Sequence, residues 1–194
     1  MSNSALSALR AFAFKQRGGF WTLLFLCVLA IAWPQREYVL PGVLLVSLGQ
    51  ILRCWGVGCI QLYRGEEVKA AVLATWGPYA LIRNPLYAGN WLIGLGFSVI
   101  AGKNAVLFFP IAFFVLYNCL IIPHEEAFLR KKFGEAYADY CLSAGRFFPK
   151  RVSAQTLQKL FSGPWNLSVV CKSEIHSLIV HVAGTLLLIS RLWW

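Results

Sequence analysis

The chain has 194 residues, of which 58% are hydrophobic and only 13% are charged, and its formal net charge is +10. A soluble domain carries about 25% charged residues, so the composition excludes an ordinary soluble domain and indicates a single integral membrane domain. The basic residues lie between apolar stretches and not in one basic region, which favours a basic membrane-facing surface over a nucleic-acid-binding protein.

Five apolar segments have about the length of a membrane-crossing helix, which is roughly 20 residues. They are residues 18–35, 38–63, 84–102, 104–124 and 175–194. Arg53 is the one charged residue inside the second segment, and Arg191 lies near the end of the fifth. A charge within a membrane segment must face the bundle interior or reach the interface. The sequence therefore predicts an all-α membrane bundle of about five transmembrane helices.

The lysines and arginines are distributed unevenly between the two ends of these segments. Fourteen of the 18, including Arg64 and Lys69, lie on the side that holds the N-terminus, and only Arg36, Lys103 and Arg191 lie on the other side. Basic residues are enriched in cytoplasmic loops. We therefore expect the N-terminus and the longer loops to face the cytoplasm, in a bacterial inner membrane or the endoplasmic reticulum.

The short connection at Lys103 predicts that the third and fourth segments form an antiparallel hairpin. The charged stretches 64–83 and 125–172 would then meet at the open end of this hairpin. Residues 124–142 have the pattern of an amphipathic helix at the membrane surface, with a break at Gly134. We expect residues 152–172 to be a linker.

Two adjacent carboxylates, Glu125 and Glu126, follow the fourth segment. Such a pair at the mouth of a hydrophobic bundle is costly unless a positive group lies nearby. Pairing with Arg130 on the same helix is one explanation. The other is a bound cationic group, such as the ammonium of an amino acid, and we expect the positive partner to be a bound cofactor.

Two arginines near the same loops could complement the glutamates. Arg83 and Arg146 could anchor the membrane surface, or either could hold a carboxylate through two parallel hydrogen bonds. Glutamates and an arginine together would bind both ends of a zwitterionic amino acid. Pro85 directs Asn84 away from helical geometry, and the backbone group that it frees is tolerated at membrane depth where it meets a ligand or cavity.

Aromatic side chains accompany this stretch. Tyr79, Tyr87 and Trp91 fit an aromatic interface belt, or one ring could face a sulfonium or an adenine. The glycines at 89, 94 and 96 favour close helix packing. His176 and His181 have no partner motif and are interpreted as structural. No metal site is predicted, because His, Cys and carboxylate residues do not cluster at ligand spacing.

At these residues the chain resembles the membrane methyltransferases that include isoprenylcysteine carboxyl methyltransferase and phospholipid N-methyltransferase. Members of that family pair a G-x-Y-x-x-x-R-H-P-x-Y segment with a later Glu-Glu and a G-R-x-F-P ending. The matching residues are Gly77, Tyr79, Arg83, Asn84, Pro85, Tyr87, Glu125, Glu126, Gly145, Arg146, Phe148 and Pro149. The family histidine is asparagine here, so the position cannot carry charge. The resemblance divides the single domain 1–194 into N-terminal spans 18–72, a methyltransferase core 73–151, and a linker and C-terminal span 152–194.

The resemblance implies that S-adenosylmethionine binds in a cytoplasm-side pocket and that a lipid or lipidated substrate enters from the bilayer. Glu125 and Glu126 would contact the methionyl end of the cofactor, and Arg83 or Arg146 would lie near its carboxylate or the acidic group of the substrate. Tyr79, Asn84, Pro85 and Tyr87 would complete the cofactor site. Arg146 and Glu126 are the residues assigned to catalysis. A carboxylate acceptor needs no base, whereas an ammonium acceptor must first lose a proton, to Glu126 or to water.

Two other functions fit parts of the sequence. NADPH-dependent sterol or enone reductases of membranes have a turn similar to Lys132-Phe133-Gly134 and a pair similar to Tyr140-Cys141, but this chain is short for that class. A non-enzymatic membrane subunit explains the hydropathy but not the paired motifs. The adjacent glutamates favour the methyltransferase.

Overall fold

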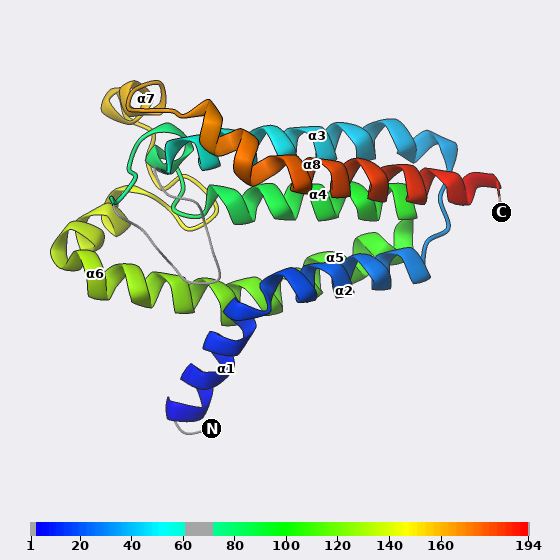
Figure 1. The fold of residues 1–194 in the computed structure, drawn as a ribbon, viewed down its shortest axis with the longest axis horizontal. Helices are drawn as coiled ribbons and strands as arrows, with labels where there is room; N and C mark the ends of the chain where they lie inside the picture. The colour runs from blue at the N-terminus through cyan, green and yellow to red at the C-terminus, as the bar shows by residue number, and fades with distance from the viewer. Residues whose placement is uncertain (1–2, 61–71, 194) are drawn as a thin grey trace.

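The computed structural model describes residues 3–60 and 72–193, and every regular element in that part of the chain is helical (Figure 1). The predicted all-α class is confirmed. In chain order the elements are α1 (Asn3–Lys15), α2 (Arg17–Ala30), α3 (Arg36–Cys59), the 3₁₀ turn η1 (Gly77–Ala80), α4 (Pro85–Ala101), α5 (Lys103–Phe113), the π-helix η2 (Phe114–Ile121), α6 (Ile122–Ser143), α7 (Ala154–Leu160), α8 (Leu167–Ser190) and the 3₁₀ turn η3 (Arg191–Trp193).

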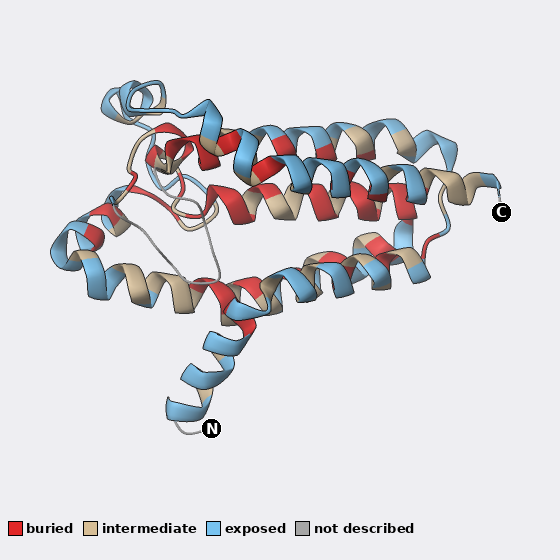
Figure 2. Cartoon of the chain, in the orientation of Figure 1, coloured by how far each residue is buried: buried red, intermediate tan, exposed pale blue. Residues whose placement is uncertain are grey.

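The five predicted apolar segments correspond to five helical segments. Three are long and apolar enough to cross a membrane, namely Arg36–Cys59, Lys103–Ser143 and Leu167–Trp193, and the shorter apolar helices are Arg17–Ala30 and Pro85–Ala101. The outer faces of α3 and α8 are largely exposed, whereas buried residues concentrate on α4 (Figure 2). The exposed positions include apolar side chains such as Leu44, Ile51 and Leu186. This arrangement is typical of helices that face lipid.

Two predicted boundaries differ from the structure. The C-terminal helix begins at Leu167 and not at Ile175, so the predicted linker 152–172 includes the start of α8 and the short helix α7. The side chain of Asn166 accepts hydrogen bonds from the amides of Ser168 and Val169 and so caps α8 at this earlier point. At the second segment, α3 ends at Cys59, and the predicted end at Tyr63 lies outside the described residues, as do Arg64 and Lys69.

Close packing of α3 against α4 positions the centre of the bundle. A Cβ atom at Gly49 would lie 2.6 Å from the carbonyl oxygen of Gly89, and one at Gly96 would lie 2.6 Å from that of Gly42. Any larger residue would therefore force the two helices apart. The prediction that glycines of the third segment permit close helix packing is confirmed at these two crossings.

The predicted hairpin of the third and fourth segments is confirmed. Helix α4 ends at Ala101, Gly102 turns the chain with a φ of 100°, and α5 begins at Lys103. A φ in this region is rarely adopted by residues other than glycine.

The predicted surface helix is not separate from the fourth span. α5, η2 and α6 follow one another without an intervening loop over 41 residues, and the helix is interrupted only by a kink at Gly134. It passes through Pro123, which lacks the amide that would bond to the carbonyl of Cys119 in an α-helix, and Nε of Arg10 on α1 donates to that carbonyl at 3.2 Å. The predicted break is confirmed, because Gly134 has non-helical angles (φ 51°, ψ −124°).

Candidate active site

The two charged stretches meet through their backbones. The amide of Arg83 donates to the carbonyl of Gly145 at 2.7 Å, and the amide of Gly145 donates to the carbonyl of Leu81 at 3.2 Å. Ile82 and Gly145 form an isolated parallel bridge. A Cβ atom at position 145 would overlap the carbonyl oxygen of Phe148, so the chain requires glycine here. The meeting that the hairpin predicted is therefore present.

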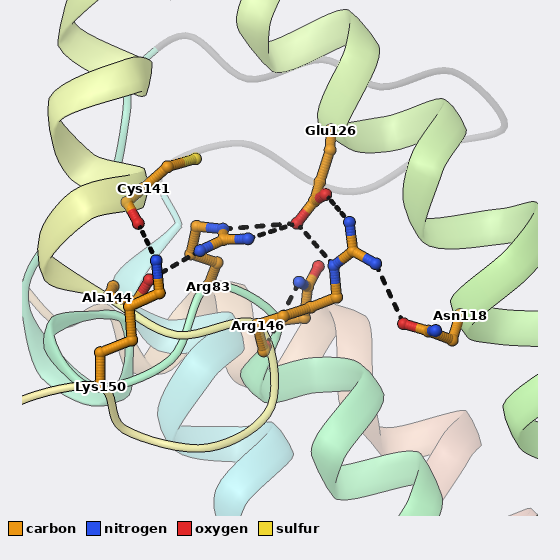
Figure 3. Close-up of polar contacts among 8 residues, drawn as sticks. Arg83, Asn118, Glu126, Cys141, Ala144, Arg146 and Lys150 are labelled. Carbon is orange, nitrogen blue, oxygen red and sulfur yellow. Dashed lines mark hydrogen bonds and ion pairs between the residues drawn. The ribbon is translucent and has the colours of Figure 1, made fainter.

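This backbone pairing places Glu126 between two arginines, Arg83 and Arg146 (Figure 3). Oε1 of Glu126 accepts from Nη2 of Arg83 at 3.1 Å and from Nε of Arg146 at 3.2 Å. Its other oxygen, Oε2, accepts from Nη2 of Arg146. The side chains of Glu126 and Arg83 are 14% and 11% exposed, so this ion pair is largely withdrawn from water.

The two arginines are held by further hydrogen bonds. Nη1 of Arg83 donates to the carbonyl of Ala144 at 2.6 Å, and Nη1 of Arg146 donates to Oδ1 of Asn118 at 3.0 Å. Burial lowers the pKa of the Arg83 guanidinium, but the carboxylate of Glu126 more than offsets this and raises the pKa above its usual value. Each guanidinium group is therefore held in place by at least two partners.

Glu125 has a different partner from its neighbour. The hydroxyl of Tyr87 donates to Oε2 of Glu125 at 2.6 Å. Tyr87 is buried on α4, and its ring centroid lies 5.3 Å from that of Tyr117. The two adjacent glutamates thus have different contacts: Glu126 binds the two arginines, and Glu125 binds the tyrosine.

Asn84, Pro85 and Tyr79 form the chain segment beside these contacts. Asn84 precedes α4, and its carbonyl accepts the first helical bond from the amide of Ala88, while Pro85 occupies the first helical position. Nδ2 of Asn84 donates to the carbonyl of Arg146 at 3.4 Å. Tyr79 packs with the buried end of α6, where the hydroxyl of Tyr140 donates to its carbonyl at 2.8 Å.

The structure brings all eight predicted site residues to one end of the hairpin. Within the chain, Glu126 pairs with Arg83 and Arg146 and not with Arg130, and Glu125 accepts a hydrogen bond from Tyr87. The bound cofactor as a partner of the glutamates stays a prediction. The sequence reading missed Asn118, which orients Arg146. The signal was available, since an amide within an apolar membrane segment requires a polar partner.

The arrangement of charges suits a zwitterionic ligand. Two guanidinium groups around one carboxylate leave a net positive charge that could hold an anionic group, and a second carboxylate, Glu125, lies beside it. No group of three or more His, Cys, Asp or Glu residues that could hold a metal occurs in 3–60 and 72–193.

The sequence pattern of the phospholipid methyltransferase family matches residues 38–136, which is half of the chain. The chain belongs to this family. The match includes the arginine–asparagine–proline step and both glutamates, and it ends before Arg146 and before α8. Membership in the phospholipid methyltransferase family supports a membrane methyltransferase.

Two proteins similar in sequence to this chain are named as metal resistance proteins. The chain is 32% identical to the cobalt-zinc-cadmium resistance protein CzcN of Cupriavidus metallidurans over 153 residues, which cover 74% of this chain and 68% of the relative. It is 28% identical to the nickel-cobalt-cadmium resistance protein NccN of Alcaligenes xylosoxydans xylosoxydans over 159 residues, covering 76% and 71%. No solved structure matches the chain.

Proposed function

We propose that the protein is an S-adenosylmethionine-dependent methyltransferase that acts on a lipid or lipidated substrate within the membrane. The acceptor is either a carboxylate of the isoprenylcysteine type or an amine of the phospholipid type. The observation that carries this proposal is the position of Glu126 between Arg83 and Arg146, beside the contact of Glu125 with Tyr87. Family membership gives it independent support.

The donor set fits an amino-acid end such as that of S-adenosylmethionine. The glutamates offer carboxylates to an ammonium group, and the arginines offer paired N–H donors to a carboxylate. Binding a zwitterion here requires the Glu126 carboxylate to share its arginine contacts with the ligand. Tyr79, Asn84, Pro85 and Tyr87 would form the wall of the site.

The chemistry asks little of the protein beyond placement. S-adenosylmethionine, when bound, supplies an electrophilic methyl group on a sulfonium. The residues of the chain hold the two reactants in line and exclude water. Because the methyl group passes directly from donor to acceptor, no nucleophilic side chain is needed. With an amine acceptor, Glu126 would accept the proton that the ammonium must lose. With a carboxylate acceptor no base is needed, and Arg146 would orient the acidic group.

The proposal also includes the orientation of the site in the membrane and the division of the chain into a catalytic core and flanking spans. The site would face the cytoplasm, as the excess of basic residues predicts, and residues 73–151 would form the catalytic core between N-terminal and C-terminal spans.

Methyl transfer can be tested directly in membranes. Lipid extracts from cells with and without the protein would be compared by mass spectrometry, and we expect one lipid class to gain a CH₂ unit only when the protein is present. The Glu126→Gln variant serves as the inactive control. Identical lipid profiles in all three samples, with the wild-type protein present in the membrane, would contradict the proposed activity.

A further inference from the structure

A π-helix, η2, lies between α5 and α6 and carries a residue that contacts the candidate active site. Helices with i→i+5 hydrogen bonds are rare and frequently occur at functional sites. Oδ1 of Asn118, in the middle of η2, accepts from Nη1 of Arg146 at 3.0 Å. The conformation of η2 therefore sets the position of one of the groups that hold Arg146.

The π-helix suits the contacts of Arg146, which bonds two residues of the same helical segment. Its guanidinium donates to Asn118 and to Glu126, which are eight positions apart. In a regular α-helix, residues at this separation lie roughly 12 Å apart along the axis. A π-helix has more residues in each turn and is shorter than an α-helix of the same residues. η2 thus brings the two side chains closer along the axis, so that one guanidinium reaches both.

The junction of η2 with α6 leaves one carbonyl without its α-helical donor. Pro123 has no amide, so the carbonyl of Cys119 lacks the partner that an α-helix would give it. Nε of Arg10, on α1, donates to this carbonyl at 3.2 Å across 109 positions of the chain. Backbone carbonyls within a membrane need such partners. Cys119 directly follows Asn118, so this contact holds the backbone that carries the Asn118 side chain.

Helix α1 packs against both η2 and α6 (Figure 1). Besides the contact of Arg10, the ring centroid of Phe14 lies 5.2 Å from that of His124, and Phe14 is buried. His124 directly precedes Glu125. α1 therefore contacts the sequence neighbours of two site residues, Asn118 and Glu125. It precedes the family match, which begins at residue 38, so these contacts are not part of the family pattern.

We propose that Arg10 is a positioning residue for the candidate active site. By binding the carbonyl of Cys119, it holds η2 in the π-helical form in which Asn118 orients Arg146. Arg146 then keeps its contact with Glu126. Arg10 acts only through η2 and is not a catalytic residue. That the orientation of Arg146 serves the binding of S-adenosylmethionine rests on the proposed function, whereas the placement of η2 by Arg10 does not.

Calorimetry of S-adenosylmethionine binding to the full-length protein in detergent tests the role of Arg10. Arg10→Met removes the donor but keeps an unbranched side chain, and we expect the affinity to fall about threefold to tenfold, as for the loss of one hydrogen bond. Arg10→Lys keeps a donor and should restore most of the affinity. Lys15→Met removes the same charge from an exposed position of α1 and is the control. Affinity of Arg10→Met equal to that of the control would overturn the proposal.

A double-mutant cycle shows whether Arg10 acts through Asn118. Asn118→Leu removes the amide that orients Arg146 and should itself weaken binding about tenfold. If Arg10 acts through this amide, adding Arg10→Met should change the affinity by about twofold or less, whereas independent effects would multiply. The reference cycle combines Arg10→Met with Tyr87→Phe, which removes the hydroxyl that donates to Glu125, and there the effects should multiply. Multiplied effects in the Asn118 cycle would overturn the proposed route.

Hydrogen exchange separates this inference from the proposed function. The amides that follow Cys119 in η2 and α6 should exchange about tenfold faster in Arg10→Met than in wild type, and those of Lys15→Met should match wild type. Protection of the α4 amides in the same samples shows that each variant is folded. Equal exchange in Arg10→Met and wild type would mean that Arg10 does not hold η2 and would overturn the proposal. If wild-type protein bound no S-adenosylmethionine while Arg10→Met still exchanged faster, the proposed function would fail and the placement of η2 by Arg10 would stand.

Discussion

Nη2 of Arg83 and Oε1 of Glu126 lie 3.1 Å apart although the two residues are separated by 43 positions in the chain. Arg83 ends the loop before α4, and Glu126 lies in the first turns of α6. The contact therefore joins the two open ends of the hairpin formed by α4 and α5. The carboxylate of Glu126, which Arg83 and Arg146 share, therefore lies beside the backbone pairing of Gly145 with the loop before α4.

The carboxylate of Glu126 is expected to be needed for cofactor binding. Glu126→Gln keeps the shape of the side chain but removes the charge that Arg83 and Arg146 share, and we expect affinity for S-adenosylmethionine to fall about 10- to 100-fold. Glu125→Gln should weaken binding as well. Calorimetry on detergent-solubilised protein measures both, and Glu135→Gln, at an exposed position of the same helix, is the control. Unchanged affinity in both site variants would refute the role of the glutamates.

Arg146 is expected to act through the geometry of its guanidinium and not through its charge alone. It donates to both oxygens of Glu126 and to Asn118 at once, which a lysine ammonium cannot reproduce in the same plane. We expect Arg146→Lys to lower methyl transfer about tenfold or more, while Arg151→Lys, at an exposed position, leaves it unchanged. Full activity of Arg146→Lys would show that a positive charge is sufficient at this site.

The features that the sequence predicted are those set by local pattern and chain connectivity. The apolar segments, the short hairpin connection at Lys103 and the break at Gly134 follow from composition and local pattern, so they could be read directly, whereas the part played by Gly102 in the turn was not predicted. The meeting of the two motif stretches followed from the short hairpin connection. These features account for the fold class and for the location of the candidate site.

The choice of side-chain partners could not be predicted in the same way. Glu126 had three arginines within reach in principle, and the rotation of α6 against the loop before α4 selects Arg83 and Arg146 over Arg130. Arg53 and Glu174 are 121 positions apart, and their contact depends on how α8 packs against α3. A search for the carboxylate that a lone intramembrane arginine needs would have suggested Glu174, the one acidic residue after position 151.

Gly145 is expected to control the assembly of the site. Its amide and carbonyl pair with Leu81 and Arg83, and an added Cβ would overlap the backbone of Phe148. We expect Gly145→Ala to shift this loop and to reduce S-adenosylmethionine affinity although no charged group is altered. Gly18→Ala is a suitable control, because no atom lies within 4 Å of the position of its Cβ. Affinity equal to that of the control would mean that the backbone pairing does not position the site.

The predicted orientation can be tested with a reporter fused after Lys159, in α7. The excess of lysine and arginine on this side predicts a cytoplasmic signal. A reporter at Lys103, the first residue of α5 after the turn at Gly102, should give the opposite signal. Reversed readings from the two fusions would contradict the orientation and place the candidate site on the external face.

The ion pair of Arg53 with Glu174 is expected to contribute strongly to the stability of the bundle. Their side chains are 16% and 5% exposed, so Glu174→Gln would leave the Arg53 charge buried without its counter-ion. Breaking a buried pair in this way costs about 3–5 kcal/mol, and thermal unfolding in detergent should show a clear loss. The double variant Arg53→Met with Glu174→Met should be more stable than the single variant, because no charge is then left uncompensated. Glu135→Gln, at an exposed position of α6, makes the same change in net charge and is the control. An unfolding temperature of Glu174→Gln equal to that of Glu135→Gln would show that water or a lipid compensates Arg53 without the carboxylate.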